Sequence, residues 1–160
     1  MRHLLLPLRP GARPSTTPLA QDGHGHGDGF VHRQTSQNAP LQLQEELFRR
    51  ACALELVEIH QSKISVPGAR GFSIRDQSAR GPDEAFMVEG EFAHLHPAHD
   101  GSLHLALSPA TYDEVRDKGW GEPHPLAKTM MAFGPRDQDE LEVLWQIFLA
   151  SYRFARGEPE

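Results

Sequence analysis

Cysteine, long apolar runs and positive charge are all scarce in this chain of 160 residues. The single cysteine, Cys52, excludes an internal disulfide and fits a reducing, cytoplasmic compartment. No apolar run approaches the roughly 18 residues that a membrane span needs. Residues 40–160 hold 12 of the 16 basic and 20 of the 22 acidic residues, a net charge of −8. This charge argues against nucleic acid or an anionic membrane as a partner and leaves a small-molecule substrate as the expected one.

The first 38 residues offer little apolar surface for a core. They are rich in Pro, Gly, Ser, Thr and Gln, and the apolar run at Leu4–Leu8 is short and broken by Pro7. That run is too short for a signal peptide. His24 and His26 alternate with glycine and offer only an adventitious metal contact. We therefore predict a disordered tail over residues 1–38, whose removal leaves the melting temperature almost unchanged, and one domain over residues 39–160.

The pattern of apolar residues predicts an α+β domain. Helical spacing begins at residue 41 and extends to about residue 56, and a wide apolar stripe follows the cap signal at Asp137. A third, shorter helix is expected between Ser108 and Gly119. Between these helices the pattern alternates as in strands, at residues 57–66, 71–76, 85–95, 103–107 and 128–133. This order is typical of an antiparallel sheet with helices packed on one face.

Four of the ten histidines lie within residues 94–104, in a stretch that predicts a β-hairpin. A three-residue loop, His99–Asp100–Gly101, would pair His96 with His104 across the hairpin. His94, His96, His104 and Phe92 would then share one face, and the opposite face would be aliphatic, with Ala93, Leu95, Leu103, Leu105 and Leu107. A two-residue loop would instead put His104 in the aliphatic layer, where an imidazole needs partners.

A further histidine, His124, is expected to approach this hairpin from a later loop. Gly119 and Gly121 allow the chain to reverse around Trp120, while Pro123 and Pro125 keep His124 extended. We therefore expect His124 to face His94, His96 and His104.

The residues support three interpretations of this cluster. In the first, a histidine is a general base, Asp100 and His99 orient it, Phe92 and Trp120 stack on a flat substrate, and Arg136 holds its oxygen anion. In the second, His94, His96 and His104 bind zinc or iron and leave one position open, with Asp100 as another possible ligand.

In the third interpretation the histidines satisfy one another in a non-catalytic module that binds a small molecule. Trp120 fits a packed loop anchor equally well, and an ion pair with a carboxylate fits Arg136 better than a ligand role. His32 and His60 are expected to have structural roles only.

Three separated blocks carry a resemblance to a known family. They are residues 92–107, with all four hairpin histidines, residues 118–127, with Lys-Gly-Trp-Gly and His-Pro-Leu-Ala, and residues 134–137, Gly-Pro-Arg-Asp. Over residues 91–151 the chain resembles the luciferase domain of bioluminescent fungi. It is similar, and closer still, to small bacterial proteins that share this domain.

The resemblance implies an oxidoreductase that uses molecular oxygen as co-substrate and needs no flavin or haem. Fungal luciferases oxidise a hydroxylated styryl-pyrone, so an electron-rich aromatic or enolic small molecule is the implied substrate class. Two features depart from the family: this sequence shows no membrane-anchoring segment, and it has Gly101 where the fungal pattern has another small residue. On this basis we expect no cofactor, zinc or iron remaining the alternative, and activity that survives a chelator.

Overall fold

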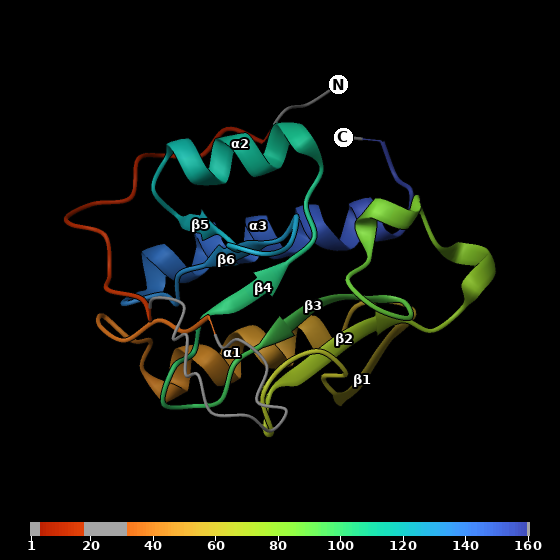
Figure 1. Cartoon of the computed structure of the whole chain (residues 1–160), viewed down its shortest axis with the longest axis horizontal. Coiled ribbons are helices and arrows are strands. Elements are labelled where there is room, and N and C mark those ends of the chain that lie inside the picture. The colour runs from red at the N-terminus through yellow and green to blue at the C-terminus, as the bar shows by residue number, and fades with distance from the viewer. Residues whose placement is uncertain (1–3, 18–31, 160) are drawn as a thin grey trace.

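The computed structural model describes residues 4–17 and 32–159 and shows one antiparallel sheet with helices on one side (Figure 1). Neighbouring strands follow the order β1-β2-β3-β4-β6-β5, and every pair is antiparallel. The strands are β1 Val57–Gln61, β2 Arg70–Ile74, β3 Glu91–Leu95, β4 Leu103–Leu105, β5 Gly121–Pro123 and β6 Met130–Ala132, and the helices are α1 Leu41–Cys52, α2 Pro109–Asp117 and α3 Gln138–Ala155. The predicted α+β class is confirmed.

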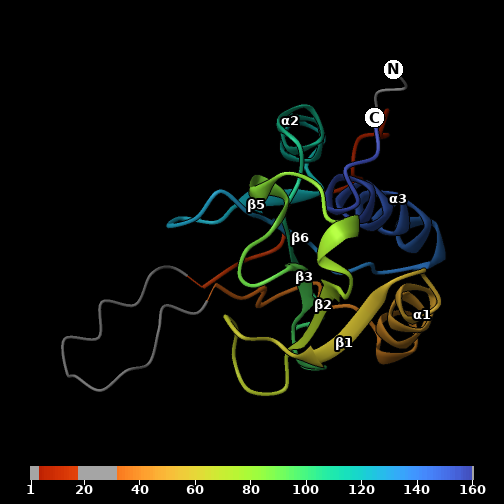
Figure 2. The ribbon, with the colours of Figure 1, turned by 90° about the vertical axis from the view of Figure 1, so that its right-hand side faces the viewer.

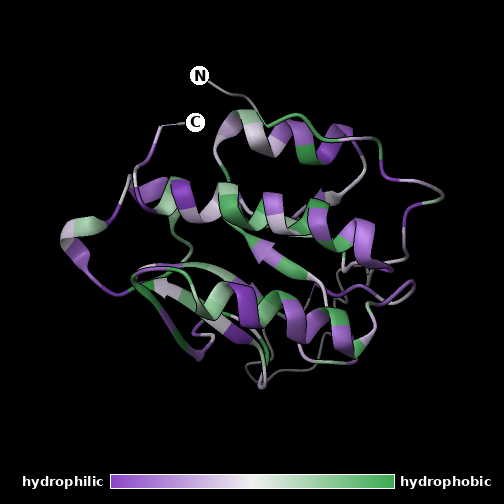
Figure 3. Ribbon diagram, turned by 180° about the vertical axis from the view of Figure 1, so that it is seen from behind, coloured by the Kyte–Doolittle hydropathy of each residue, from purple (hydrophilic) through white to green (hydrophobic). Residues whose placement is uncertain are grey.

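Helices α1 and α3 cover one face of the sheet, and α2 packs near β5 and β6 (Figure 2). Two short 3₁₀ helices, Gln77–Ala79 and Asp83–Ala85, connect β2 to β3. Seen from behind, polar and apolar stretches alternate along α1 and α3, as they do in helices with one buried face (Figure 3). In the described residues no helix has the length and apolar composition that crossing a membrane requires.

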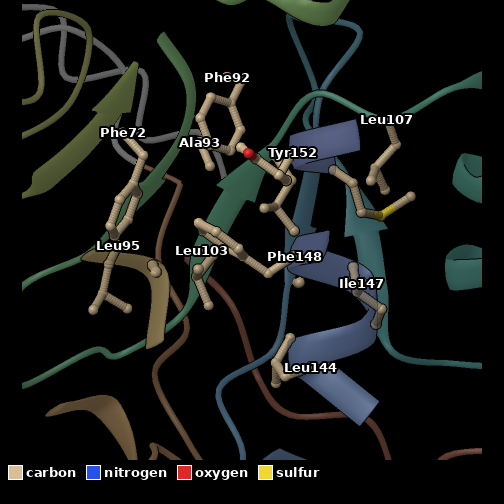
Figure 4. Close-up of a cluster of buried hydrophobic side chains, with 14 of the residues drawn as sticks. Phe72, Phe92, Ala93, Leu95, Leu103, Leu107, Leu144, Ile147, Phe148 and Tyr152 are labelled. Carbon is tan, nitrogen blue, oxygen red and sulfur yellow. The ribbon is translucent and has the colours of Figure 1, made fainter. Parts of the chain in front are cut away.

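The core lies between α3 and the aliphatic face of the sheet (Figure 4). Phe148 of α3 makes edge contacts with Phe72 of β2 and Phe92 of β3, with ring centroids 5.1 Å and 5.7 Å apart. Leu95 and Leu103 pair across the hairpin and are fully buried. Helix α3 begins where the sequence indicates, because the Asp137 side chain accepts a hydrogen bond from the Glu140 amide at 2.9 Å.

The hairpin has the predicted faces but a different register. His94 pairs directly with His104 and Leu95 with Leu103. The pairing is therefore shifted by two residues from the one that a three-residue loop predicts, in which His96 pairs with His104. The loop is longer because the His96 amide bonds to the Ser102 carbonyl, which leaves residues 97–101 in the turn. A shift of two residues preserves the alternation of side chains, so His94, His96 and His104 still share a face.

A β-bulge in β3 explains why Phe92 leaves that face. Phe72 pairs with Ala93 and Ser73 pairs with Glu91, so Phe92 is the extra residue. The bulge turns Phe92 into the core against Phe148 and brings Glu91 to the histidine side, where it contacts His94. The prediction that Phe92 stands beside the histidines is therefore wrong.

Two segments of the predicted tail pack against the domain. Residues 4–17 and 32–38 contain no helix or strand, as predicted, and residues 18–31 lie outside the described residues. Nevertheless Leu6 is part of the core, and the Pro7 carbonyl accepts a hydrogen bond from Trp120 Nε1 at 2.6 Å. The packed unit therefore includes residues before residue 39, which corrects the expectation that removing them leaves the stability unchanged.

Replacing Leu6 by alanine is expected to lower the free energy of unfolding by about 2 kcal/mol, since the side chain is only 6% exposed. Urea denaturation of the purified variant measures this loss. Leu5, which is 86% exposed, provides the matched control, and Leu5→Ala should change stability by less than about 0.5 kcal/mol. Equal stabilities for the two variants would show that the segment does not pack.

Candidate functional site

A cavity of about 920 Å³ lies beside the histidine cluster. Loops 62–69 and 124–129 project on the side of the sheet away from α1 and α3 (Figure 2), and both contribute to its lining. Six histidines line it, together with apolar side chains that include Ile64, Val66, Phe86 and Met87; the histidines are His32, His94, His96, His99, His104 and His124. The sheet therefore offers a histidine wall to a space large enough for a small organic molecule.

His94 is oriented by a buried carboxylate on its own strand. Its Nδ1 lies 2.9 Å from Glu91 Oε1, and Glu91 also accepts hydrogen bonds from the Ser62 hydroxyl and the Lys63 amide. Burial alone would raise the pKa of Glu91, but these hydrogen bonds, with His94 the strongest, hold its pKa below the ordinary value. An ionised carboxylate only accepts, so Nδ1 of His94 carries the proton and Nε2 presents a lone pair.

His96 has the same arrangement in the turn of the hairpin. Its Nδ1 lies 2.9 Å from Asp100 Oδ2 and 3.0 Å from the Ser102 hydroxyl oxygen. Asp100 Oδ1 accepts from both the amide and the hydroxyl of Ser102. Burial opposes the charge of Asp100, but the hydrogen bonds from His96 and Ser102 lower its pKa overall. Nε2 of His96 therefore also presents a lone pair.

His104 joins these two residues to a third carboxylate. Its Nδ1 lies 3.0 Å from His94 Nε2 and 3.1 Å from His96 Nε2. On the other side of the ring, Nε2 lies 3.2 Å from His32 Nδ1, and His32 Nε2 is 2.5 Å from Glu122 Oε1. The hydrogen-bonded series Glu122–His32–His104 therefore ends at His104 Nδ1, the atom that Nε2 of His94 and Nε2 of His96 both approach.

The carboxylates fix a consistent set of neutral tautomers along these chains. Glu122 requires a proton on His32 Nε2, so His32 Nδ1 is an acceptor and His104 Nε2 must be the donor. His104 Nδ1 is then unprotonated. With these tautomers, three imidazole lone pairs, on His94 Nε2, His96 Nε2 and His104 Nδ1, face one another without a proton between them, an arrangement that a cation could satisfy.

Protonating this cluster is unfavourable. Burial, followed by the charge of the neighbouring histidines, lowers the pKa of His104 well below its ordinary value. Burial also lowers the pKa of His94, which the hydrogen bond to Glu91 only partly offsets. His94 and His104 are therefore neutral near pH 7 and available as bases or as metal ligands.

Two histidine triads in the described residues have metal-binding geometry, and they share His104. One consists of His94, His96 and His104, all buried, and the other of His32, His104 and His124. In the second triad, Nδ1 of His124 accepts a hydrogen bond from the Leu126 amide at 3.1 Å, and His32 Nδ1 faces His104 Nε2. The first triad is therefore the better ligand set, because all three of its lone pairs point to one place.

The structure brings together some of the predicted site residues and separates others. His124 lies where expected, with its ring 5.1 Å from that of His104, and Asp100 orients His96 as proposed. His99 is exposed at the cavity rim, without the orienting position expected for it. Trp120 is buried against Pro7, and Arg136 forms an ion pair with Glu140, so neither of them lines the cavity.

Three residues of the site escaped the sequence analysis. His32 comes from the segment assigned to the tail, Glu91 reaches the histidines only because of the bulge, and Glu122 lies on β5, which was taken as a loop. His32, for which only a structural role was expected, contacts His104 directly. An isolated histidine before a helix carries no spacing signal that would have identified it.

The comparisons with known proteins concern these same residues. A family model described as the luciferase domain matches residues 89–151, which contain the bulge, all four hairpin histidines and His124. Residues 89–151 are therefore similar to the luciferase domain. The resemblance seen in the sequence is thereby confirmed.

The luciferase domain has relatives among fungal proteins. The chain is 28% identical to a luciferase of Armillaria mellea, over 96% of this chain and 62% of the relative. It is 38% identical to a luciferase of Armillaria gallica and 37% identical to one of Neonothopanus nambi, in each case over 48% of this chain and 32% of the relative. The chain thus spans less than two thirds of the length of these relatives. No solved structure is significantly similar to it.

Acidification should destabilise the metal-free protein below about pH 6.5. His94 and His104 have lowered pKa values, so the unfolded chain binds protons that the folded chain does not, and stability is lost as the pH falls. Each such histidine contributes up to about 1.4 kcal/mol per pH unit. Urea denaturation in a chelator between pH 6 and 5 should give a shallower slope for His104→Gln than for His60→Gln. Identical slopes would show that His104 titrates normally.

Proposed function

We propose that the luciferase domain catalyses the oxidation, by molecular oxygen, of a small electron-rich aromatic or enolic compound bound in the cavity. The observation that carries this proposal is the convergence of three buried imidazoles on one wall of the cavity. The same residues fall within the match to a family whose relatives are named luciferases. The free cysteine Cys52 is consistent with a cytoplasmic location.

The proposed step needs only a proton acceptor and oxygen. An imidazole Nε2, of His94 or His96, removes a proton from the substrate, and the resulting enolate or phenolate carbon attacks oxygen. The O–H bond of the substrate and one of its C=C π bonds are broken, a carbonyl and a carbon–oxygen bond form, the substrate supplies two electrons, and the proton returns from the imidazole to the terminal oxygen to give a hydroperoxide. The carboxylates Glu91 and Asp100 hold each imidazole in the tautomer that accepts the proton.

The shape and lining of the cavity suit a flat, mostly apolar molecule. Its volume lies within the roughly 300–1,000 Å³ typical of small-molecule sites. Phe86 and Met87 offer apolar contacts in the place of Phe92 and Trp120, which lie in the core.

Oxygen uptake tests the proposal. The tag-free full chain is incubated with a panel of hydroxy-pyrones and catechols, and oxygen and substrate consumption are measured together. We expect uptake of one oxygen molecule per substrate molecule with at least one compound. Binding of a compound without oxygen uptake across the panel would instead favour a non-catalytic binding module.

A further inference from the structure

We propose that His94 Nε2, His96 Nε2 and His104 Nδ1 bind a divalent transition-metal ion that has an open coordination position toward the cavity. This inference rests on the proposed function, because it places the ion where the substrate would react. The binding itself is measurable without any substrate. Of the alternatives that the sequence left open, this inference favours a metal enzyme over an enzyme in which a histidine is the general base and no cofactor is bound.

The spacing of the three nitrogens fits one ion. A tetrahedral zinc site has metal–nitrogen distances of about 2.0–2.1 Å, which puts neighbouring ligand nitrogens roughly 3.3 Å apart. In this structure His104 Nδ1 is 3.0 Å from His94 Nε2 and 3.1 Å from His96 Nε2. All three ligand atoms lie within 4.8 Å of one another, so rotation of the rings would bring them to the distances that one ion requires.

The three ring nitrogens also lack a hydrogen-bond donor between them. With the tautomers set by Glu91, Asp100 and Glu122, none of the three nitrogens carries a proton. Buried lone pairs that face one another without a donor are destabilising, because each has lost its hydrogen bond to water. A metal ion satisfies all three at once.

The surroundings provide the charge and orientation that a bound ion needs. Glu91 and Asp100 are both buried and supply two negative charges, which balance a divalent ion held by three neutral imidazoles. Metal-bound histidines commonly donate their other ring nitrogen to a carboxylate, and here both His94 and His96 do so. Glu122 acts in the same way on His104 through His32.

The donor set selects the kind of ion. Three imidazoles favour zinc, iron, copper or nickel, whereas magnesium and calcium require oxygen ligands. An ion here would favour the anionic form of a substrate oxygen by Lewis-acid polarisation. The three ring nitrogens would then be ligands and no longer bases, so the ion would lower the pKa of a coordinated substrate hydroxyl and the released proton would pass to solvent water.

Metal titration of the full, tag-free chain tests the inference. The protein is stripped with a chelator, and binding of Zn²⁺ and of Co²⁺ is measured by calorimetry and by the visible spectrum of the cobalt form. We expect one tight site per chain and a cobalt spectrum typical of four-coordination. His94→Gln and His96→Gln should each weaken binding by more than the roughly 10–100-fold typical for the loss of an outer partner.

Three control variants separate this site from other histidines. The double variant His24→Gln/His26→Gln removes the two glycine-flanked histidines of the tail and should bind as tightly as the wild type. His60→Gln, on β1 and outside the cavity lining, should do the same. His124→Gln should keep one metal site per chain. If His124→Gln instead lost the site while His94→Gln still bound the ion, the ion would belong to the triad of His32, His104 and His124, and the inference would be overturned. Circular dichroism of each variant shows whether it is folded.

The outcomes also separate the metal from the proposed function. Absence of a tight site in the folded wild-type chain, or its loss in the tail variant, overturns the metal inference. Oxygen uptake by fully chelated protein would leave the proposed function standing and remove the metal from it. Tight binding at the three histidines without oxygen uptake on any substrate would support the site and contradict the proposed function.

Discussion

Replacing His104 by glutamine is expected to slow oxygen uptake by a factor on the order of 10²–10⁴, the range associated with loss of a catalytic proton acceptor. His104 Nδ1 is the atom that both His94 Nε2 and His96 Nε2 approach. Its removal disrupts the point of convergence whether a proton or a metal ion occupies it. The measurement is the initial rate of oxygen consumption with the best substrate of the panel.

His60→Gln is the control for this prediction. His60 does not line the cavity and bonds to the Gln61 carbonyl and the Ser73 hydroxyl; its Nδ1 is 3.9 Å from Glu91 Oε2, which is too long for a hydrogen bond. Its rate should remain within a factor of about three of the wild-type rate. A folded His104→Gln protein with a rate equally close to the wild type would show that the cluster has no part in the reaction.

Replacing Asp100 by asparagine should weaken metal binding by roughly 10–100-fold, although Asp100 itself is not a ligand. Asp100 Oδ1 already accepts the amide and hydroxyl of Ser102, so the amide group of asparagine would turn its NH₂ toward His96 Nδ1. That nitrogen would then have to accept, and the proton of His96 would move to Nε2, where the metal should bind.

The matched control is Asp76→Asn. Asp76 Oδ1 accepts from the amide and the hydroxyl of Ser78, the same local arrangement, but it is exposed and is far in sequence from the cluster. ¹⁵N chemical shifts of His96 in both variants report the tautomer directly. Unchanged affinity in Asp100→Asn, with His96 still protonated at Nδ1, would contradict the role assigned to this carboxylate.

The alternation of side chains in the hairpin was predictable, because successive residues of any β-strand point to opposite faces of the sheet. A turn was indicated by Gly101, whose φ is +74° and whose added Cβ would approach Gln44 Nε2 to 2.5 Å. The register was not predictable, since the five-residue turn is held by groups remote in sequence. Gln44 of α1 donates to the Ala98 carbonyl, and Asn38 donates to the Asp100 carbonyl.

The less predictable parts of the site depend on tertiary contacts. Gly90, whose φ is +84°, is a local sign of an irregular strand, but only the pairing with β2 places the bulge at Phe92, which exchanges an aromatic ring for the carboxylate of Glu91 on the histidine face. Similarly, His32 reaches His104 only because its segment runs back along the domain. His124 was predictable because the prolines and glycines around it restrict the backbone.

Isotope labelling tests the central claim most directly. The wild-type chain is incubated with its best substrate under ¹⁸O₂, and the product is analysed by mass spectrometry. The proposed reaction predicts that the primary product contains two ¹⁸O atoms from one oxygen molecule, and that this product is lost in parallel with the rate in His104→Gln. A product without the label, or substrate recovered unchanged from every compound of the panel, would contradict oxygenation at the histidine cluster.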